Sequence, residues 1–333
     1  MTAYFLGADL GGTKTHVMIA DDSGHVIGFG ESGPGNHESV GYEGFQANLH
    51  HASKMALRTS GVRTDQISGA GFGIAGYDWP IEKEPTLRVV KTLDLGGAVE
   101  VVNDTELGLL AGSPRLWGVA VVSGTGCNCR GWDQDRRHFG RVTGGGIDFG
   151  EYAGASELMF KVSNILGRTW SGRSPETALT TAFCQHFEVK DLTELVQGLI
   201  CHKFSLSAAD APLVFQVAES GDPVAVDLVK WAGRELGEMA CAVIRQLKFE
   251  AVDFDLVQIG GMFDGSPLLT DEMKKLVHTI APKANFIRTH EPPVLGAVLL
   301  GMEAAGMHPN TEIRSMLIET LPLARQKSLE VVA

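Results

Sequence analysis

The sequence has few cysteines, and none of them stands in a spacing typical of metal or redox sites. Its five cysteines include no Cys-x-x-Cys pair, which argues against a zinc ribbon and a thioredoxin-type site. No apolar stretch approaches the roughly 18 residues needed to span a bilayer, and the N-terminus has no basic leader, so we expect a cytoplasmic protein. Basic residues are also in deficit, at 28 Lys and Arg against 40 Asp and Glu. Because they are scattered, we expect neither a nucleic acid nor a membrane as partner.

The length of the chain indicates more than one domain. Its 333 residues suit two domains of about 100 to 200 residues each. Hydrophobic residues make up 44% and charged residues 20% of the chain, which is ordinary for a globular protein. The turn at Ser113-Pro114 would serve as a hinge. We therefore expect domains at 1–114 and 115–333, with a C-terminal helix able to pack back on the first domain.

Hydrophobic periodicity predicts an α/β fold in which one pattern occurs twice. In the first half, strands joined by tight turns alternate with amphipathic helices, which is typical of an α/β sheet. We expect strands at 4–9, 15–21, 25–31, 67–74 and 99–103, and helices around 45–56, 84–93 and 106–111. The second half begins in the same way, with strands at 118–122, 127–132 and 137–142, followed by a helix through 229–247, a strand at 254–259 and a helix at 295–305. The two halves therefore resemble duplicated folds.

Two glycine-rich turns, one in each half, predict phosphate binding. They are Asp9-Leu10-Gly11-Gly12-Thr13-Lys14-Thr15 and Ser123-Gly124-Thr125-Gly126, each after a predicted strand. Glycines let backbone N–H groups approach phosphate oxygens, and the hydroxyls of Thr13 and Thr125 add a donor to each turn. One such turn alone is more often a simple hairpin, but the pair favours a clamp for ATP. Asp9, at the end of its strand, can hold Mg²⁺ beside the phosphates.

Asp104 is the candidate general base. It lies between a predicted strand and a predicted helix, where open α/β sheets place ligand-binding groups. A carboxylate within about 3 Å of a hydroxyl can accept its proton as the oxygen attacks phosphorus. The alternative is that Asp104 is the N-cap of the helix, a position for which Asp is well suited.

Other polar and glycine residues have both a functional and a structural interpretation. Asn36 offers a carbonyl and an amide to a pair of sugar hydroxyls, or it is simply a turn residue in Gly-Pro-Gly-Asn. Lys14 is either a charge partner for phosphate or a solvated strand residue. Gly260 and Gly261 would let adenosine lie against the backbone, although glycines at strand ends are common in turns.

One glycine pattern suggests a dinucleotide site that the context argues against. Residues 71–76 fit Gly-x-Gly-x-x-Gly, but a dinucleotide site needs a helix opening within the pattern. Here Tyr77-Asp78-Trp79-Pro80 follows and indicates a loop. We therefore interpret the segment as the end of a strand with closely packed backbone.

Taken in order, these motifs resemble the sugar kinase, Hsp70 and actin superfamily, and within it the BadF/BadG/BcrA/BcrD-type ATPase family that includes N-acetylglucosamine kinases and archaeal hexokinase. The similarity covers most of the chain. The segments that carry it are 9–15, 33–37, 73–78, 103–104, 123–130, 144–151 and 259–261. The resemblance implies two ribonuclease-H-like domains with a nucleotide cleft between them, a small-molecule sugar as substrate, ATP and Mg²⁺ as cofactors, and a homodimer.

The resemblance also implies site residues. ATP would be bound by Gly11, Gly12, Thr13, Lys14, Gly124, Thr125, Gly126, Gly260 and Gly261, and the sugar by Asn36, Gly76, Asp104, Gly144, Gly145, Gly146 and Glu151. The chain departs from its relatives at two places. They usually carry a tryptophan where this chain has Gly145, and an acidic pair followed by Gly-Ser where it has Glu151-Tyr152-Ala153-Gly154-Ala155. These departures bear on which sugar fits rather than on the chemistry.

The function implied is ATP-dependent phosphorylation of a hexose or amino sugar, with N-acetylglucosamine or glucosamine preferred. Two alternatives stand beside it. One is an ATPase activator of a dehydratase or reductase, which would need cysteines for a cluster shared between two subunits. The other is a sugar or nucleotide sensor that has lost turnover, for which the altered segment around Glu151 is the only support.

Overall fold

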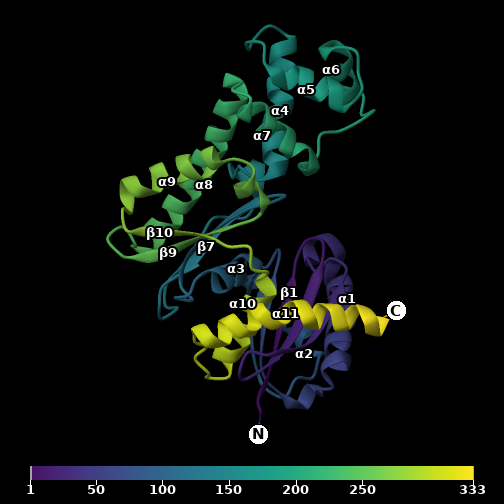
Figure 1. The fold of residues 1–333 in the computed structure, drawn as a ribbon, viewed down its shortest axis with the longest axis vertical. Coiled ribbons are helices and arrows are strands. Elements are labelled where there is room, and N and C mark those ends of the chain that lie inside the picture. The colour runs from purple at the N-terminus through teal and green to yellow at the C-terminus, as the bar shows by residue number, and fades with distance from the viewer. Residues whose placement is uncertain (1, 333) are drawn as a thin grey trace. The chain divides into compact units, whose positions relative to one another are not determined.

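The structure, a computed structural model, describes residues 2–332. The chain divides into two compact units: unit 1 comprises Met1–Gly118 and Ile287–Ala333, and unit 2 comprises Val119–Phe286. The C-terminal segment, which the sequence analysis counted with the second domain, thus falls in unit 1. Each unit contains one five-stranded sheet (Figure 1).

The sheet of unit 1 has the strand order β3-β2-β1-β4-β5. Its strands are β1 Tyr4–Leu10, β2 Thr15–Asp21, β3 Val26–Ser32, β4 Ile67–Ile74 and β5 Ala98–Asn103. The first three form an antiparallel meander because short turns join them, whereas β4 runs parallel to β1 and β5 parallel to β4. Parallel neighbours need a crossover, and helices provide it here.

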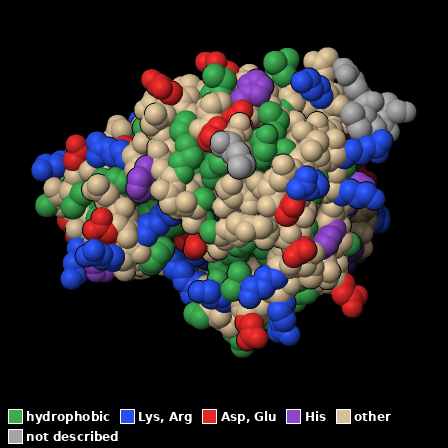
Figure 2. All heavy atoms as spheres, turned by 90° about the horizontal axis from the view of Figure 1, so that it is seen from below, with side chains coloured by type: hydrophobic (Ala, Val, Ile, Leu, Met, Phe, Trp, Pro, Cys, Tyr) green, Lys and Arg blue, Asp and Glu red, His purple; other side chains and the backbone are tan. Residues whose placement is uncertain are grey.

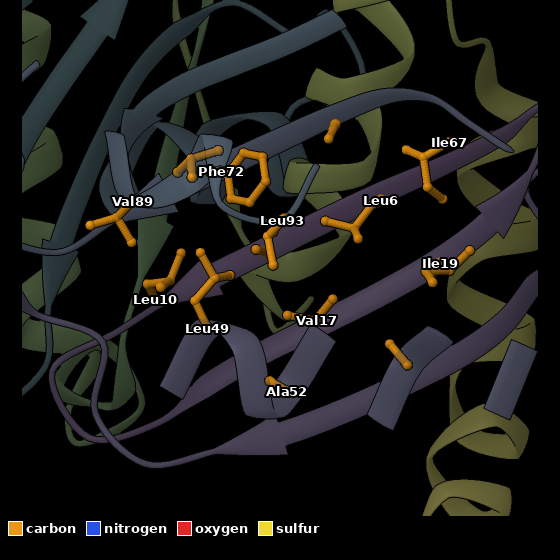
Figure 3. Packing of buried hydrophobic residues seen from close by; sticks show 14 of the residues in the cluster. Leu6, Leu10, Val17, Ile19, Leu49, Ala52, Ile67, Phe72, Val89 and Leu93 are labelled. Atoms are coloured by element: carbon orange, nitrogen blue, oxygen red, sulfur yellow. The ribbon is translucent and has the colours of Figure 1, made fainter. Parts of the chain in front are cut away.

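Alternating side chains give this sheet two buried faces. Along β1, Leu6 and Leu10 belong to one hydrophobic cluster and Phe5 to another; along β2, Val17 and Met18 divide in the same way. The first cluster, drawn in Figure 3, contains residues of β1, β2 and β4 together with α1 (His37–Ser60). Successive side chains of a strand point to opposite faces of the sheet, so hydrophobic neighbours along β1 and β2 enter different clusters.

Helices from both ends of the chain cover the sheet of unit 1. The helices are α1, α2 Lys83–Lys91, α3 Asp104–Gly112, α10 Pro293–Ala304 and α11 Thr311–Val332. α1 packs on β2 and β3, while α10 packs on β1 and β4 and α11 on β3. Figure 1 shows α10 and α11, coloured yellow, beside the N-terminal strands coloured purple. The hydrophobic cluster that contains Phe5 and Met18 also contains Val294, Val298 and Leu317, and so it fills the space between the sheet and the helices α10 and α11.

Glycines of β4 allow α3 and α10 to approach the sheet closely. A Cβ at Gly71 would lie 2.2 Å from the carbonyl oxygen of Ala297, and one at Gly73 would lie 2.1 Å from Leu107. Real side chains do not tolerate such distances, so both positions require glycine. The Gly-x-Gly-x-x-Gly pattern of 71–76 is thus accounted for by packing, and no helix opens within it.

The sheet of unit 2 has the order β10-β9-β6-β7-β8. Written in reverse, as β8-β7-β6-β9-β10, it is the order of unit 1 with β6 to β10 in the places of β1 to β5. Its strands are β6 Gly118–Ser123, β7 Cys127–Trp132, β8 Phe139–Arg141, β9 Phe254–Ile259 and β10 Ala284–Arg288. The helices are α4 Ala155–Trp170, α5 Ala178–His186, α6 Leu192–Ile200, α7 Ala211–Glu219, α8 Pro223–Leu247 and α9 Pro267–Ile280. The predicted duplication of one α/β pattern is therefore confirmed.

Every strand expected from the sequence is present, with the largest difference at β8, which is shorter than predicted. The helices α4 to α7 and α9 and the strand β10 were not predicted. α5, α6 and α7 have nine residues each, so none shows the periodicity over several turns that a sequence pattern needs. Within residues 2–332, no helix has the length and apolar character needed to cross a bilayer. Figure 2 shows basic and acidic side chains distributed over the same face.

Candidate active site

The carboxyl ends of three strands of unit 1 meet at one edge of the sheet. In the parallel registers, Leu10 lies opposite Ile74 and Ile74 opposite Asn103. Asp9 is the penultimate residue of β1 and Asp104 directly follows β5, so both carboxylates lie at this edge. Burial, and then the negative charge of Asp104, raise the pKa of Asp9 to about 7. Asp9, the predicted metal ligand, and Asp104, the predicted base, are therefore close enough for the charge of Asp104 to affect the protonation of Asp9.

Asp104 is not the N-cap of α3. The cap is Asn103, whose side-chain oxygen accepts a hydrogen bond from the Thr105 N–H at 3.0 Å. Glu106 completes a capping box by accepting from the Asn103 N–H at 2.8 Å. Asp104 is the first residue of the helix, half-buried, and one of its oxygens also accepts from Thr105 at 2.9 Å. The structural role that competed with catalysis is thus carried by its neighbour.

Loops from elsewhere in unit 1 hold the first glycine turn in place. The turn is closed by a hydrogen bond from the Gly11 N–H to the Lys14 carbonyl at 2.9 Å. The Gly11 carbonyl accepts from Gly35, and the Leu10 carbonyl accepts from Ala75, each at 2.9 Å. Gly12 and Thr13 are exposed at the tip. The backbone of the turn is fixed while its tip can reach a ligand.

Lys14 lies on the side of the turn that faces β3. Its ammonium group is 2.8 Å from a carboxylate oxygen of Glu31, and both side chains are about half exposed. Glu31 also accepts from His16 at 3.1 Å. Lys14 directly precedes β2, and contact with phosphate would require its pair with Glu31 to break.

Asn36 and Gly76 meet at the same edge of unit 1. Asn36 is the N-cap of α1, and its side-chain oxygen accepts from the Glu38 N–H at 2.8 Å. Gly76 has φ +78°, and a Cβ there would lie 2.6 Å from that oxygen. The side-chain carbonyl of Asn36 is therefore occupied by its hydrogen bond to the first turn of α1. Its amide nitrogen has no hydrogen bond in the part of the chain that the structure describes and can donate to a ligand.

The loop after Gly76 contributes an aspartate that the sequence analysis did not single out. Asp78 accepts a hydrogen bond from the side-chain amide of Asn103 at 3.2 Å. Glu82 accepts from the backbone N–H groups of Asp78 and Trp79, each at 2.7 Å. The residue that caps the helix of Asp104 thus also fixes this loop. Only the fold reveals the link, because Asp78 and Asn103 are far apart in the sequence.

The second glycine turn, in unit 2, rests on a helix instead of on other loops. The Gly124 N–H donates to the Gly126 carbonyl at 2.9 Å. The carbonyls of Gly124 and Thr125 accept from Ala155 and Ser156, the first residues of α4, at 2.8 and 2.9 Å. Thr125 and Gly126 are exposed. The hydroxyl of Thr125 makes no hydrogen bond among the described residues.

A buried carboxylate lies behind this turn. Glu157, in the first turn of α4, is 8% exposed, and its Oε2 atom has no hydrogen-bond partner among the described residues. Its Oε1 atom lies 4.0 Å from the position that a Cβ on Gly126 would occupy. Burial raises the pKa of Glu157 above its usual value. No sequence motif points to this residue.

Gly260 lets the end of β9 approach the same turn. Its φ is +103°, and a Cβ there would lie 2.3 Å from the Ser123 carbonyl and 3.0 Å from the Gly124 nitrogen. Gly261 begins a short 3-10 turn, Gly261–Asp264, and is exposed. The predicted adenosine loop and the predicted phosphate turn are thus neighbours within unit 2.

A cavity of about 780 Å³ opens beside these two loops. Gly124, Thr125 and Gly261, all predicted from the sequence, contribute to its wall. The rest of the lining was not predicted and is formed by Ala155, Ala208, Ala209, Ala211, Pro212, Phe215, Gln216, Glu219, Met262, Asp264 and Gly265. Small apolar residues with a few polar ones are typical of a small-molecule site, and the volume suits a nucleotide. Most of these residues come from around α7, whose sequence carries no motif.

Glu151 holds the glycine-rich segment that follows β8. One carboxylate oxygen accepts from the N–H and the hydroxyl of Thr143 at 2.6 and 2.7 Å, and the other from the Gly146 N–H at 3.4 Å. Glu151 is 6% exposed. The carboxylate of Glu151 is therefore buried and holds the loop 144–150, which contains the predicted sugar-binding residues Gly144 and Gly146, by hydrogen bonds to Thr143 and Gly146.

The two departures from the family pattern have structural counterparts. A Cβ on Gly145 would lie 2.4 Å from the ring of Phe149, so this phenyl ring occupies the space of a larger residue at 145. The ring of Tyr152 lies 5.6 Å from that of Trp231, and the ammonium group of Lys161 lies within 5.3 Å of both ring centroids. Tyr152 thus forms a cation–π cluster at a position where the family resemblance predicts an acid.

The residues present fit a magnesium ion at Asp9. Mg²⁺ is usually held by one or two carboxylates together with substrate phosphates. Asp9 is a desolvated carboxyl beside a second one, Asp104, and a cation would relieve the penalty that raises the pKa of Asp9. Among the described residues no cluster of three or more His, Cys, Asp or Glu could hold a metal by itself.

Comparison with known proteins assigns the chain to a family. The sequence profile of the BadF/BadG/BcrA/BcrD ATPase family matches residues 6–301. The chain belongs to this family. The resemblance inferred from the motifs is thereby confirmed, and so is the α/β class with two sheets of one topology.

Curated relatives extend over nearly the whole chain. An N-acetylmuramic acid/N-acetylglucosamine kinase of Clostridium acetobutylicum is 26% identical and is covered over 97% of its length by 89% of this chain. An N-acetyl-D-glucosamine kinase of Dictyostelium discoideum is also 26% identical, with 98% of it and 90% of this chain aligned. A solved ROK family glucokinase of Streptomyces griseus, in complex with glucose and AMPPNP, shares the fold with a TM-score of 0.58 at 18% identity, covering 90% of this chain and all of that one.

Proposed function

We propose that this protein is an ATP-dependent sugar kinase that phosphorylates a hydroxyl of N-acetylglucosamine or glucosamine. The observation that carries the proposal is the carboxylate pair at the edge of the unit 1 sheet, Asp9 and Asp104, with the capping role taken by Asn103. The names of the curated relatives support the kinase class and, of the two sugars, N-acetylglucosamine.

In the proposed reaction Asp104 is the general base. As the sugar oxygen forms a bond to the γ-phosphorus, its proton passes to a carboxylate oxygen of Asp104, and the bond from phosphorus to the bridging oxygen breaks to release ADP. A positioned base of this kind contributes about 10²- to 10⁴-fold to a rate. Its place as first residue of α3 keeps the carboxylate at the carboxyl end of β5, where the positive end of a helix dipole favours a negative charge.

The remaining roles follow the division into units. In unit 1, Asp9 would hold Mg²⁺, which when bound offsets the charge of the phosphates, and Gly11, Gly12 and Thr13 would donate to phosphate oxygens. In unit 2, Gly124, Thr125 and Gly126 would do the same, and Gly260 and Gly261 with the cavity beside them would bind adenosine. Lys14 contributes only if it leaves Glu31.

Sugar recognition is assigned to Asn36, Gly76 and Asp104. The amide of Asn36 donates to a hydroxyl, and the bare α-carbon of Gly76 lets the sugar approach the backbone. For Gly144, Gly145, Gly146 and Glu151 a role in sugar binding remains a prediction from the family resemblance, with Glu151 acting through the loop it holds.

A coupled ADP-release screen tests the proposal. Glucosamine, N-acetylglucosamine, glucose, N-acetylmannosamine and N-acetylmuramic acid are compared with Mg·ATP, and the Asp104→Asn variant is the matched control. We expect N-acetylglucosamine or glucosamine to accelerate ADP release most and the variant to respond to neither. If no sugar accelerates ADP release while sugars still raise the melting temperature, the protein is a sensor and the kinase proposal is wrong.

A further inference from the structure

Glu38 lies beside the residues assigned to sugar recognition, although no motif includes it. It belongs to the first turn of α1, which is separated from the rest of the helix by Gly41, where the backbone has φ +67° and ψ 171°. The short turn is fixed by Asn36, whose backbone carbonyl accepts from the N–H groups of Ser39 and Val40 at 3.1 Å each. The position of Glu38 is therefore set by the same residue that is assigned to the sugar.

The side chains of Glu38 and Asn36 converge on Gly76. A Cβ on Gly76 would lie 2.6 Å from Oδ1 of Asn36 and 2.9 Å from Oε2 of Glu38. The glycine, with φ +78°, provides a bare surface between them. A ligand that reaches the amide of Asn36 over this surface also comes close to the carboxylate of Glu38.

The carboxylate of Glu38 is not committed to any internal contact. Glu38 is exposed, and within residues 2–332 its side chain makes no hydrogen bond and no ion pair. Its backbone N–H, in contrast, donates to Asn36 at 2.8 Å, so the residue is anchored through its main chain alone. A fixed backbone with an unused carboxylate is suited to binding a hydroxyl donor on a ligand.

We propose that Glu38 is a further sugar-binding residue of the proposed kinase and that its charge selects against anionic sugars. Together, the amide of Asn36 and the carboxylate of Glu38 offer one donor and one acceptor, which neighbouring sugar hydroxyls can satisfy. A sugar that carries its own carboxylate, such as N-acetylmuramic acid, meets a like charge at this point, whereas a protonated amino sugar meets an opposite one. The inference rests on the proposed function and narrows its substrate class to neutral and cationic sugars.

The test is a charge series of sugars on matched variants. N-acetylmuramic acid, N-acetylglucosamine and glucosamine are compared at slightly acidic pH, where the amine of glucosamine is protonated. The methyl ester of N-acetylmuramic acid is added because it keeps the bulk of the lactyl group without its charge. The variants are Glu38→Gln and, as control, Glu43→Gln, an exposed residue of the same helix beyond the bend at Gly41.

We expect Glu38→Gln to raise kcat/KM for N-acetylmuramic acid relative to N-acetylglucosamine about tenfold at low salt, as removal of one like charge at a partly exposed site predicts. The same variant lowers the ratio for glucosamine and leaves the ratio for the methyl ester unchanged. Glu43→Gln changes none of these ratios. A uniform change for all sugars, or no change in Glu38→Gln, overturns the inference.

Calorimetric titration of each sugar without ATP separates this inference from the proposed function. If the sugars bind with Kd values in the predicted order of charge and Glu38→Gln removes that order, the role of Glu38 stands even where turnover is absent and the kinase proposal fails. If the wild-type protein turns over sugars but binds anionic and neutral ones equally well, the kinase proposal stands and the role of Glu38 is wrong.

Discussion

The two units share one strand order but support their glycine turns differently. In unit 1 the turn after β1 is tied to Gly35 and Ala75, which belong to loops leading to Asn36 and Gly76. In unit 2 the turn after β6 is tied to Ala155 and Ser156 at the start of α4. The same topology thus connects its glycine turn to loops with polar side chains in unit 1 and to a helix beside a cavity in unit 2.

The segments between the strands explain this difference. Between β3 and β4, unit 1 has α1 as its main helix, whereas unit 2 has α4 to α8 between β8 and β9. The extra helices line the cavity of unit 2, and unit 1 instead keeps its sheet edge for the carboxylates Asp9 and Asp104. The two sheets therefore share one topology, and the segments inserted between their strands give the two units different surroundings.

If the general base belongs to unit 1, the variant Asp104→Asn should cause the largest loss of kinase activity. We expect kcat to fall about 10³-fold because the general base is lost. The Kd values for ATP and sugar change little, since the amide has the size of the carboxylate. Stopped assays of ADP release, with calorimetric titration of both ligands, measure the two effects. Unchanged turnover would show that Asp104 is not the base.

Asp9→Asn tests the electrostatics of the same edge through stability. The pKa of Asp9 in the folded protein, about 7, lies above its ordinary value of 3.8, so the stability from protonated Asp9 is complete below pH 3.8 and is lost as the pH rises through 7. The difference corresponds to at most about 4 kcal/mol of unfolding free energy. Without Mg²⁺, we expect the variant to be more stable than wild type at pH 8 and similar to it at pH 4.

Urea unfolding at both pH values, in the presence of a chelator, measures this stability difference. Added Mg²⁺ should raise the stability of the wild-type protein at pH 8 and leave that of Asp9→Asn unchanged. Equal gains in the two proteins would place the ion elsewhere.

Gly260→Ala tests whether the turn of unit 2 binds ATP. The new methyl group would lie 2.3 Å from the Ser123 carbonyl, and the backbone at φ +103° disfavours a side chain by about 1–3 kcal/mol. We expect KM for ATP to rise about tenfold with KM for sugar unchanged. Gly221→Ala is the matched control, because its φ is +89° but nothing lies within 4 Å. An equal rise in the control would assign the effect to general instability.

Gly76→Ala is the corresponding change in unit 1 and should have the opposite selectivity. The added methyl group would displace the side chains of Asn36 and Glu38, so KM for sugar rises several-fold while KM for ATP stays constant. Gly61→Ala, with φ +72° and no neighbour within 4 Å at the C-terminus of α1, controls for backbone strain. A rise in KM for ATP instead would contradict the assignment of sugar binding to this edge.

The smallest effect is expected from Lys14→Met. Because Lys14 pairs with Glu31 on the surface and such pairs contribute about 0–1 kcal/mol, KM for ATP should change less than about fivefold. Glu31→Gln, which releases Lys14, is measured alongside it. A large rise in KM for ATP in Lys14→Met would show that the lysine leaves Glu31 to bind phosphate.

The sequence predicted every strand except β10, the two turns and the family because each has a local cause. Alternation along β1 and β2 reflects burial on two faces, and glycines at 11, 12, 124 and 126 mark where a chain must turn tightly. Local patterns failed where partners come from distant segments. The cavity around α7, the link from Asn103 to Asp78 and the buried Glu157 have no signature in sequence spacing.

For this protein, residue order alone determined that there are two copies of one sheet, each with a glycine turn after its first strand, because periodicity and turn chemistry act between near neighbours. Only the tertiary structure decided that Asn103 rather than Asp104 caps α3, that Glu151 is consumed in holding its own loop, and that Glu38 meets Asn36 over Gly76. Those outcomes depend on which groups the folded backbone brings within about 3 Å. The partners of Asn103 and Glu151 are near neighbours in the chain, whereas Gly76 lies far in the sequence from Asn36 and Glu38.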